Sequence, residues 1–114
     1  MLTDPHTQMV IDQFHSKSGR YNPEYDLESA MANMRFRPEW VAHRISPRPV
    51  LMIYAENDNL VPPAEQLSCY EELGEPKKLV KLPNCQHYES YQFCNAETHA
   101  IQKGEALDWY AKYL

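Results

Sequence analysis

The chain has 114 residues, which is one small domain at most. Its Asp and Glu residues outnumber its Lys and Arg residues by 16 to 11, and the net charge of −5 excludes the basic face that binds nucleic acid or an anionic membrane surface. A content of 43% hydrophobic and 24% charged residues is typical of a globular protein, and three glycines without the required spacing exclude a P-loop or a dinucleotide-binding glycine loop.

The number of cysteines and the length of the apolar runs indicate the cellular compartment to expect for this protein. The three cysteines are an odd, sparse set, which indicates reduced thiols rather than a disulfide framework. The longest apolar run, Val50 to Ala55, is too short to span a bilayer, and the first ten residues lack the basic and then apolar pattern of a signal peptide. We therefore expect a cytoplasmic protein with neither a nucleic-acid nor a membrane partner.

Residues 1–44 are predicted to form a helical, lid-like connector. Apolar residues at near-helical spacing in "TQMVIDQFHSKSG" predict a short helix that ends at Gly19. Asp26 can cap a second helix over "LESAMANM". The proline-rich "RFRPEWVAHRISPRP" then forms a linker to the rest of the chain.

The second predicted segment, residues 45–114, has a clear α/β pattern. The continuous apolar run 50–55 is typical of a strand covered on both faces in a parallel sheet. A helix is expected over 63–73, a second strand over 77–82 and a last helix over 98–114. Two strands joined by one helix predict a right-handed crossover. The fold class is therefore α/β, with two parallel strands and flanking helices in an incomplete sheet.

An acid and a histidine follow the two predicted strands. Asp58 comes just after the first strand and His87 just after the second, so both belong to the same edge of the sheet although 29 positions separate them. A carboxylate bonded to one imidazole nitrogen fixes the tautomer and leaves the other nitrogen free to take a proton from a hydroxyl or thiol. Such a pair is two-thirds of a nucleophilic triad. Glu56 is a second candidate acid, although its place nearer the strand is more typical of a structural polar residue.

The stretch "ISPRPVLMIYAENDNLVPPAEQLSCYEELGEPKKLVKLPNCQHYESY" resembles the C-terminal part of an α/β-hydrolase. The most similar groups are the dienelactone-hydrolase-like and related serine hydrolases. The resemblance implies a partial α/β-hydrolase fold, with Asp58 as the acid and His87 as the base of a catalytic triad. It further implies hydrolysis of a small ester, lactone or amide, without a metal or an organic cofactor.

The nucleophile of that family is missing from the pattern. It lies in a G-x-S-x-G turn before the acid, and none of the serines that precede Asp58 lies between glycines in this way. The chain is thus expected to be the C-terminal part of a serine hydrolase, inactive alone, through a truncated gene, a wrongly assigned start or excision. The alternative is a non-catalytic, degenerate hydrolase module that binds a partner chain. An open sheet edge would also favour self-association.

Other interpretations remain open for the same residues. Asp58 could serve only to form a turn, and His87 could be a loop residue without a role. Tyr88 and Tyr91 could line a substrate pocket or pack against the last helix. A zinc site is a further alternative, although its spacing matches no common finger; its ligands would be Cys85, His87, Cys94 and His99.

Overall fold

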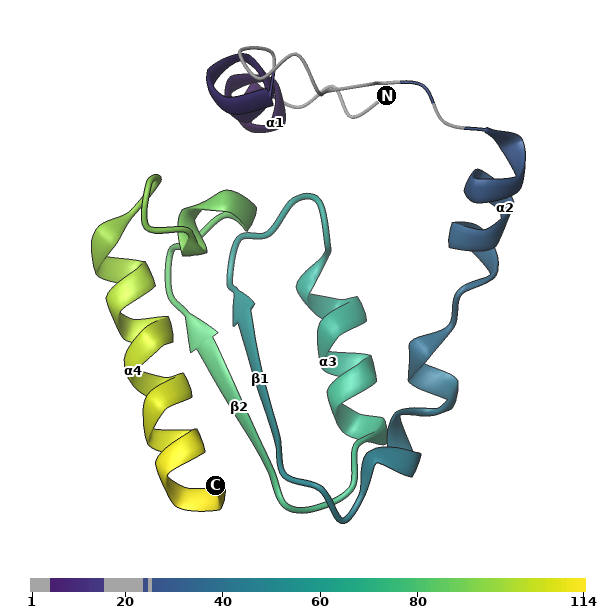
Figure 1. The fold of residues 1–114 in the computed structure, drawn as a ribbon, viewed down its shortest axis with the longest axis vertical. Helices are drawn as coiled ribbons and strands as arrows, with labels where there is room; N and C mark the ends of the chain where they lie inside the picture. Colours follow the sequence, from purple (N-terminus) through teal and green to yellow (C-terminus); the bar gives the residue numbers. More distant parts are fainter. Residues whose placement is uncertain (1–4, 16–23, 25) are drawn as a thin grey trace. The chain divides into compact units, whose positions relative to one another are not determined.

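The computed structural model describes residues 5–15, 24 and 26–114 (Figure 1). The chain divides into two compact units, Met1–Phe36 and Arg37–Leu114. This division falls within the predicted connector 1–44. Within the described residues, no helix is both long enough and apolar enough to cross a membrane.

The first unit is helical in the part that the structure describes. Helix α1 spans Pro5–Val10 and continues as one turn of π-helix, η1, over Ile11–His15. The predicted end of this helix at Gly19 lies outside the described residues. Two of its side chains, Thr7 and Val10, are buried.

Helix α2 spans Leu27–Arg35, close to the predicted range, and begins at the predicted cap. The Asp26 carboxylate accepts a hydrogen bond of 2.7 Å from the backbone N–H of Ser29, which satisfies one of the free donors of the first turn. None of the residues in α2 is buried, and Leu27 is 74% exposed. Local sequence, more than packing, therefore explains why this helix begins where it does.

The second unit contains the strands and the candidate site. Both strands have the predicted bounds, and the two longer helices differ from prediction by two residues or fewer at each end. In chain order its elements are η3 (Pro38–Trp40), η4 (Ala42–Ile45), β1 (Val50–Ala55), α3 (Pro63–Glu72), β2 (Lys77–Leu82), η5 (His87–Ser90) and α4 (Ala96–Tyr113).

The two strands form the predicted parallel sheet, flanked by α3 and α4 (Figure 1). The register runs without a bulge from Val50 opposite Lys77 to Ala55 opposite Leu82. Both carboxyl ends therefore stop at the same level of the sheet. The chain segments that follow the strands, which carry the candidate residues, leave from adjacent points.

Helix α4 begins at a strong cap and runs alongside β2. The Asn95 side chain accepts hydrogen bonds from the N–H groups of Glu97 and Thr98, both 3.1 Å long. Helix α3 starts instead at Pro63, where the missing N–H is no loss because the first helical donors have no intrahelical partner. Gly104 lies within α4 and does not interrupt the helix, which continues to Tyr113.

The core of the sheet lies at its carboxyl end. Leu82 and Cys85 are each 1% exposed and Ala55 is 6% exposed, and Ile53 packs against this cluster. The most deeply buried side chains of the unit thus lie directly beneath the candidate site. Between Leu82 and Cys85 the chain turns at Asn84, whose φ of 51° is in the left-handed region that asparagine tolerates better than most residues.

Candidate active site

The two loops that follow the strands are joined by backbone hydrogen bonds. The N–H of Glu56 donates to the carbonyl of Leu82 over 3.0 Å, which extends the strand pairing by one step. The N–H of Asn57 then donates to the carbonyl of Cys85 over 2.8 Å. These bonds fix the spacing of the loops independently of the side chains at their tips.

Glu56 reinforces this junction with its side chain. Its carboxylate accepts hydrogen bonds from the Lys81 ammonium at 2.7 Å and from the Asn84 N–H at 2.9 Å. The bond from Lys81 and that from Asn84 together lower the pKa of Glu56, against a smaller opposing effect of desolvation. Glu56 therefore has the structural role that its position indicates, and no contact with His87 appears among its hydrogen bonds.

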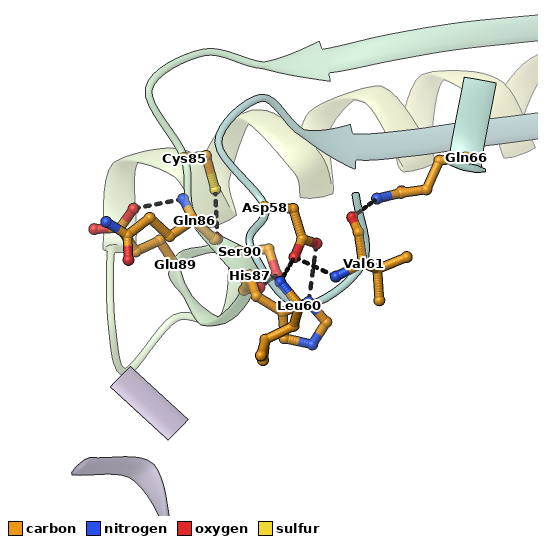
Figure 2. A network of polar contacts seen from close by, with 9 residues as sticks. All are labelled: Asp58, Leu60, Val61, Gln66, Cys85, Gln86, His87, Glu89 and Ser90. Atoms are coloured by element: carbon orange, nitrogen blue, oxygen red, sulfur yellow. Dashed lines mark hydrogen bonds and ion pairs between the residues drawn. The ribbon is translucent and has the colours of Figure 1, made fainter. Parts of the chain in front are cut away.

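Asp58 is held between its own loop and the histidine (Figure 2). Its Oδ1 atom accepts hydrogen bonds from the N–H groups of Leu60 at 2.9 Å and Val61 at 2.8 Å. Its Oδ2 atom lies 2.9 Å from Nδ1 of His87, and its side chain is only 5% exposed. The Gln66 amide donates to the Val61 carbonyl over 3.0 Å, which ties this loop to α3.

His87 is the first residue of the short helix η5, whose position is fixed by several polar contacts. Gln86 and Glu89 form a reciprocal capping box, including a bond of 2.7 Å from the Gln86 N–H to the Glu89 carboxylate. Nδ1 of His99, in α4, lies 3.1 Å from the carbonyl oxygen of Ser90. The Q-x-x-E spacing could have revealed the capping box from sequence, whereas nothing local indicates the contact with His99.

The contact with Asp58 determines which nitrogen of His87 carries the proton. An ionised carboxylate only accepts hydrogen bonds, so the neutral imidazole must place its hydrogen on Nδ1. Nε2 then carries a lone pair, and within the described residues it makes no hydrogen bond. The side chain is 30% exposed, so this nitrogen can reach another molecule. The arrangement can act as a general base and, once protonated, as a general acid.

The Asp58 carboxyl group stays ionised despite its burial. Desolvation, the largest single influence, raises its pKa, but the N–H of Val61, the His87 ring and the N–H of Leu60 together lower it. The net result is a pKa below the ordinary value of 3.8. The negative charge of Asp58 is therefore present to stabilise the His87 ring when that ring is protonated.

This shift predicts how the stability of the second unit depends on pH. Because the pKa of Asp58 is lower in the folded state than in the unfolded state, its stabilising contribution is complete above the unfolded value and is lost as the pH falls through the folded value. We expect the free energy of unfolding to decrease below about pH 4, and to decrease less in Asp58→Asn. Urea titrations between neutral and acidic pH measure this difference. Asp108→Asn, at an exposed carboxylate of α4, is the control and should follow the wild type.

A cavity of about 180 Å³ lies beside the pair. Asp58, His87, Ser90 and Tyr91 contribute to its lining, together with the ends of both strands. Gln102, from α4, also lines it and has a buried Oε1 atom without a hydrogen-bond partner among the described residues. The cavity therefore joins the acid and the histidine to the ends of both strands and to an amide oxygen that can still accept a hydrogen bond.

Two side chains close to the acid–histidine pair carry nucleophilic groups, Ser90 and Cys85, but neither is arranged to attack a substrate. The Ser90 hydroxyl donates to the carbonyl of His87 over 3.3 Å, within its own helical turn. The Cys85 thiol donates to the Gln86 carbonyl over 3.3 Å, and burial raises its pKa, which disfavours the reactive thiolate.

The four residues considered as zinc ligands do not form a metal site. In the part of the chain that the structure describes, no three His, Cys, Asp or Glu side chains are grouped to hold a metal ion.

Comparison with known proteins supports the fold. No protein-family model and no curated protein sequence matches the chain. Among solved structures it is similar to the crystal structure of the alpha/beta hydrolase GrgF from Penicillium sp. sh18, with a TM-score of 0.74 and 21% sequence identity. The match covers 94% of this chain and 36% of that protein. The fold is thus α/β-hydrolase-like, as predicted. The match does not support the narrower resemblance to dienelactone hydrolases.

Proposed function

We propose that this chain supplies the acid and the general base of a serine hydrolase that acts on an ester, lactone or amide, as dienelactone-hydrolase-like enzymes do. The observation that carries the proposal is the contact of 2.9 Å between Oδ2 of Asp58 and Nδ1 of His87. It is made at the carboxyl ends of two adjacent parallel strands, where α/β sheets present reactive groups. The burial of Asp58 and the two backbone N–H groups on its other oxygen preorganise this contact.

The proposed chemistry assigns one step to each side chain. Nε2 of His87 takes the proton of a serine hydroxyl as its oxygen attacks the substrate carbonyl, and then gives that proton to the leaving group. Asp58 holds the ring and stabilises the imidazolium that forms between these steps. The serine and the donors of the oxyanion hole come from polypeptide other than these 114 residues. The chain by itself is therefore proposed to be inactive.

Reconstitution tests this function. The probe is a fluorophosphonate, which labels activated serines, and the added component is the portion of an α/β-hydrolase that contains the G-x-S-x-G turn and the preceding strands. We expect no labelling of this chain alone and labelling of the added serine when the two polypeptides are combined or fused. The labelling should require both Asp58 and His87.

Matched variants separate this requirement from general effects on folding. Asp108→Asn and His43→Ala change the same residue types at exposed positions and should leave labelling intact. Circular dichroism and gel filtration must show that the combined protein is folded. A folded complex that is never labelled, or is labelled equally after His87→Ala, would contradict the proposal.

A second candidate function, a module that binds a partner chain, is favoured by the difference between the two sheet edges. Strand β2 carries three lysines, Lys77, Lys78 and Lys81, a common protection of exposed edges. Strand β1 is VLMIYA, without a charged residue, and among the described residues no strand pairs with its outer edge. The β1 edge is thus suited to accept a strand. In the purified chain, a second copy of β1 is the strand available for this pairing.

A further inference from the structure

A row of aromatic rings begins beside the proposed general base. The His87 and Tyr88 rings meet edge to face, with centroids 4.8 Å apart at an angle of 87°. The Tyr88 and Tyr91 rings stack with centroids 6.4 Å apart at 28°, and those of Tyr91 and Phe93 stack at 5.4 Å and 5°. Tyr88, Tyr91 and Phe93 are called the aromatic row below.

The backbone around η5 builds this row. A 3₁₀ helix places side chains three residues apart on the same side, so Tyr88 lies next to Tyr91, whose N–H donates to the Tyr88 carbonyl over 3.1 Å. The N–H groups of Cys94 and Asn95 both donate to the Tyr91 carbonyl, at 3.0 and 3.1 Å. This turn brings Phe93 back against Tyr91. The row is therefore fixed by the same short segment that positions His87.

The aromatic row is continuous with the cavity at the acid–histidine pair. Tyr91 lines that cavity together with Asp58 and His87, yet 50% of its surface is exposed. Phe93, the next ring, is 54% exposed. Tyr91 thus stands where the cavity opens to solvent, and the rings offer an apolar path from solvent to the imidazole.

We propose that the aromatic row binds a planar aromatic ring attached to the substrate carbonyl, and that it selects esters and amides of aromatic carboxylic acids. This inference rests on the proposed acyl-transfer role of His87. Aromatic rings gain edge-to-face and offset-stacked contacts that a puckered, saturated ring of similar size does not, and such contacts are worth about a threefold to tenfold difference in affinity.

A pair of small amides tests the aromatic selectivity on the full chain. Benzamide and cyclohexanecarboxamide share the amide group and differ in whether the ring is planar. Binding is followed by NMR with isotope-labelled Tyr, Phe and His rings. We expect benzamide to bind about threefold to tenfold more tightly and to shift the ring signals of Tyr91 and Phe93.

Substitutions locate the selectivity. Phe93→Leu keeps an apolar side chain but removes one ring of the aromatic row, and it should reduce the preference for benzamide. Tyr110→Leu changes a similarly exposed aromatic residue, 58% exposed on α4, and should preserve the preference. The proposal is overturned if both amides bind equally, or if benzamide shifts only signals elsewhere. A preference that is unchanged in Phe93→Leu also overturns it; should that variant misfold, the map of shifted signals in the wild type decides.

The amide-binding experiment can be interpreted separately from the proposed catalytic function. Binding of an amide needs neither a serine nor the proton on a particular nitrogen of His87. If the benzamide preference is absent while the reconstituted protein is labelled at serine, only the aromatic selectivity fails. If the preference is present while labelling fails, the row is a ring-binding site and the catalytic proposal fails.

Discussion

Asp58→Asn should reverse the tautomer of His87 and lower the acyl-transfer rate of the reconstituted hydrolase by about 10³- to 10⁴-fold. The structure gives a specific reason. The N–H groups of Leu60 and Val61 both point at Oδ1 of Asp58, so the amide oxygen of an asparagine must take this position. Its NH₂ group then faces Nδ1 of His87, where Oδ2 stands in the wild type.

Two donors cannot share one hydrogen bond, so the imidazole of Asp58→Asn must move its hydrogen from Nδ1 to Nε2. Nε2 loses the lone pair that would take the serine proton. The overall geometry should change little, because the asparagine keeps the shape of the carboxylate and its bonds to the loop. The loss therefore appears in kcat, while stability at neutral pH falls through the missing contact with His87.

Nitrogen-15 NMR of the His87 ring measures this prediction on the chain as it stands. In the wild type, the neutral ring should show the hydrogen on Nδ1, and in Asp58→Asn it should show the hydrogen on Nε2. Asp108→Asn is the matched control and should retain the wild-type pattern. A wild-type ring with its hydrogen on Nε2 would contradict the assigned role of Asp58, as would an unchanged pattern in Asp58→Asn.

The second large effect is expected at the outer edge of β1. The N–H groups of Val50 and Glu56 point toward β2, where they donate to the carbonyls of Pro76 and Leu82. Because backbone direction alternates along a strand, the N–H of Leu51 points away from β2 and that of Met52 points toward it. Adjacent positions thus serve different edges of the same strand.

Proline substitution separates the two edges. Leu51→Pro removes a donor from the outer edge and adds bulk there, so it should weaken association of the chain by about tenfold or more while the pairing with β2 remains. Met52→Pro is the matched change on the inner side and should unfold the sheet, because it removes a bond to β2. Sedimentation velocity over a range of concentrations reports association, and circular dichroism reports folding.

Measurements on the wild-type chain test whether the outer edge of β1 pairs with another strand. We expect concentration-dependent association of the purified protein, with β1 of one copy pairing with β1 of the next. A monodisperse monomer with a sharp, cooperative melt would remove the physical basis for the partner-binding function. Association that is unchanged in folded Leu51→Pro would assign it to another surface.

Much of the fold follows from local sequence. The continuous apolar run of β1 and the short segment of β2, which lies between Pro76 and Pro83, predict both strands within their observed bounds, because six residues between prolines are typical of a strand and too few for a typical helix. The cap at Asp26 likewise predicts where α2 begins. Two parallel strands joined by one crossover place Asp58 and His87 at the same edge of the sheet. This placement follows without knowledge of any contact between the two residues.

Other features required the folded structure. The role of Glu56 depends on Lys81 and Asn84, which are distant in the chain and come near only through strand pairing. The aromatic row depends on the 3₁₀ geometry of η5 and on a turn that no sequence pattern marks.

Patterns along the chain are enough to predict the order of strands and helices, the parallel sheet and the two residues at its carboxyl edge. These depend on hydrophobic period, on the constraint of a right-handed crossover and on residue chemistry at strand ends. The folded structure was needed to establish which oxygen of Asp58 faces His87, that Glu56 braces the loops, and that the rings extend from the site to solvent. Those outcomes depend on contacts between distant segments, whose geometry is set by packing and backbone hydrogen bonds rather than by local pattern.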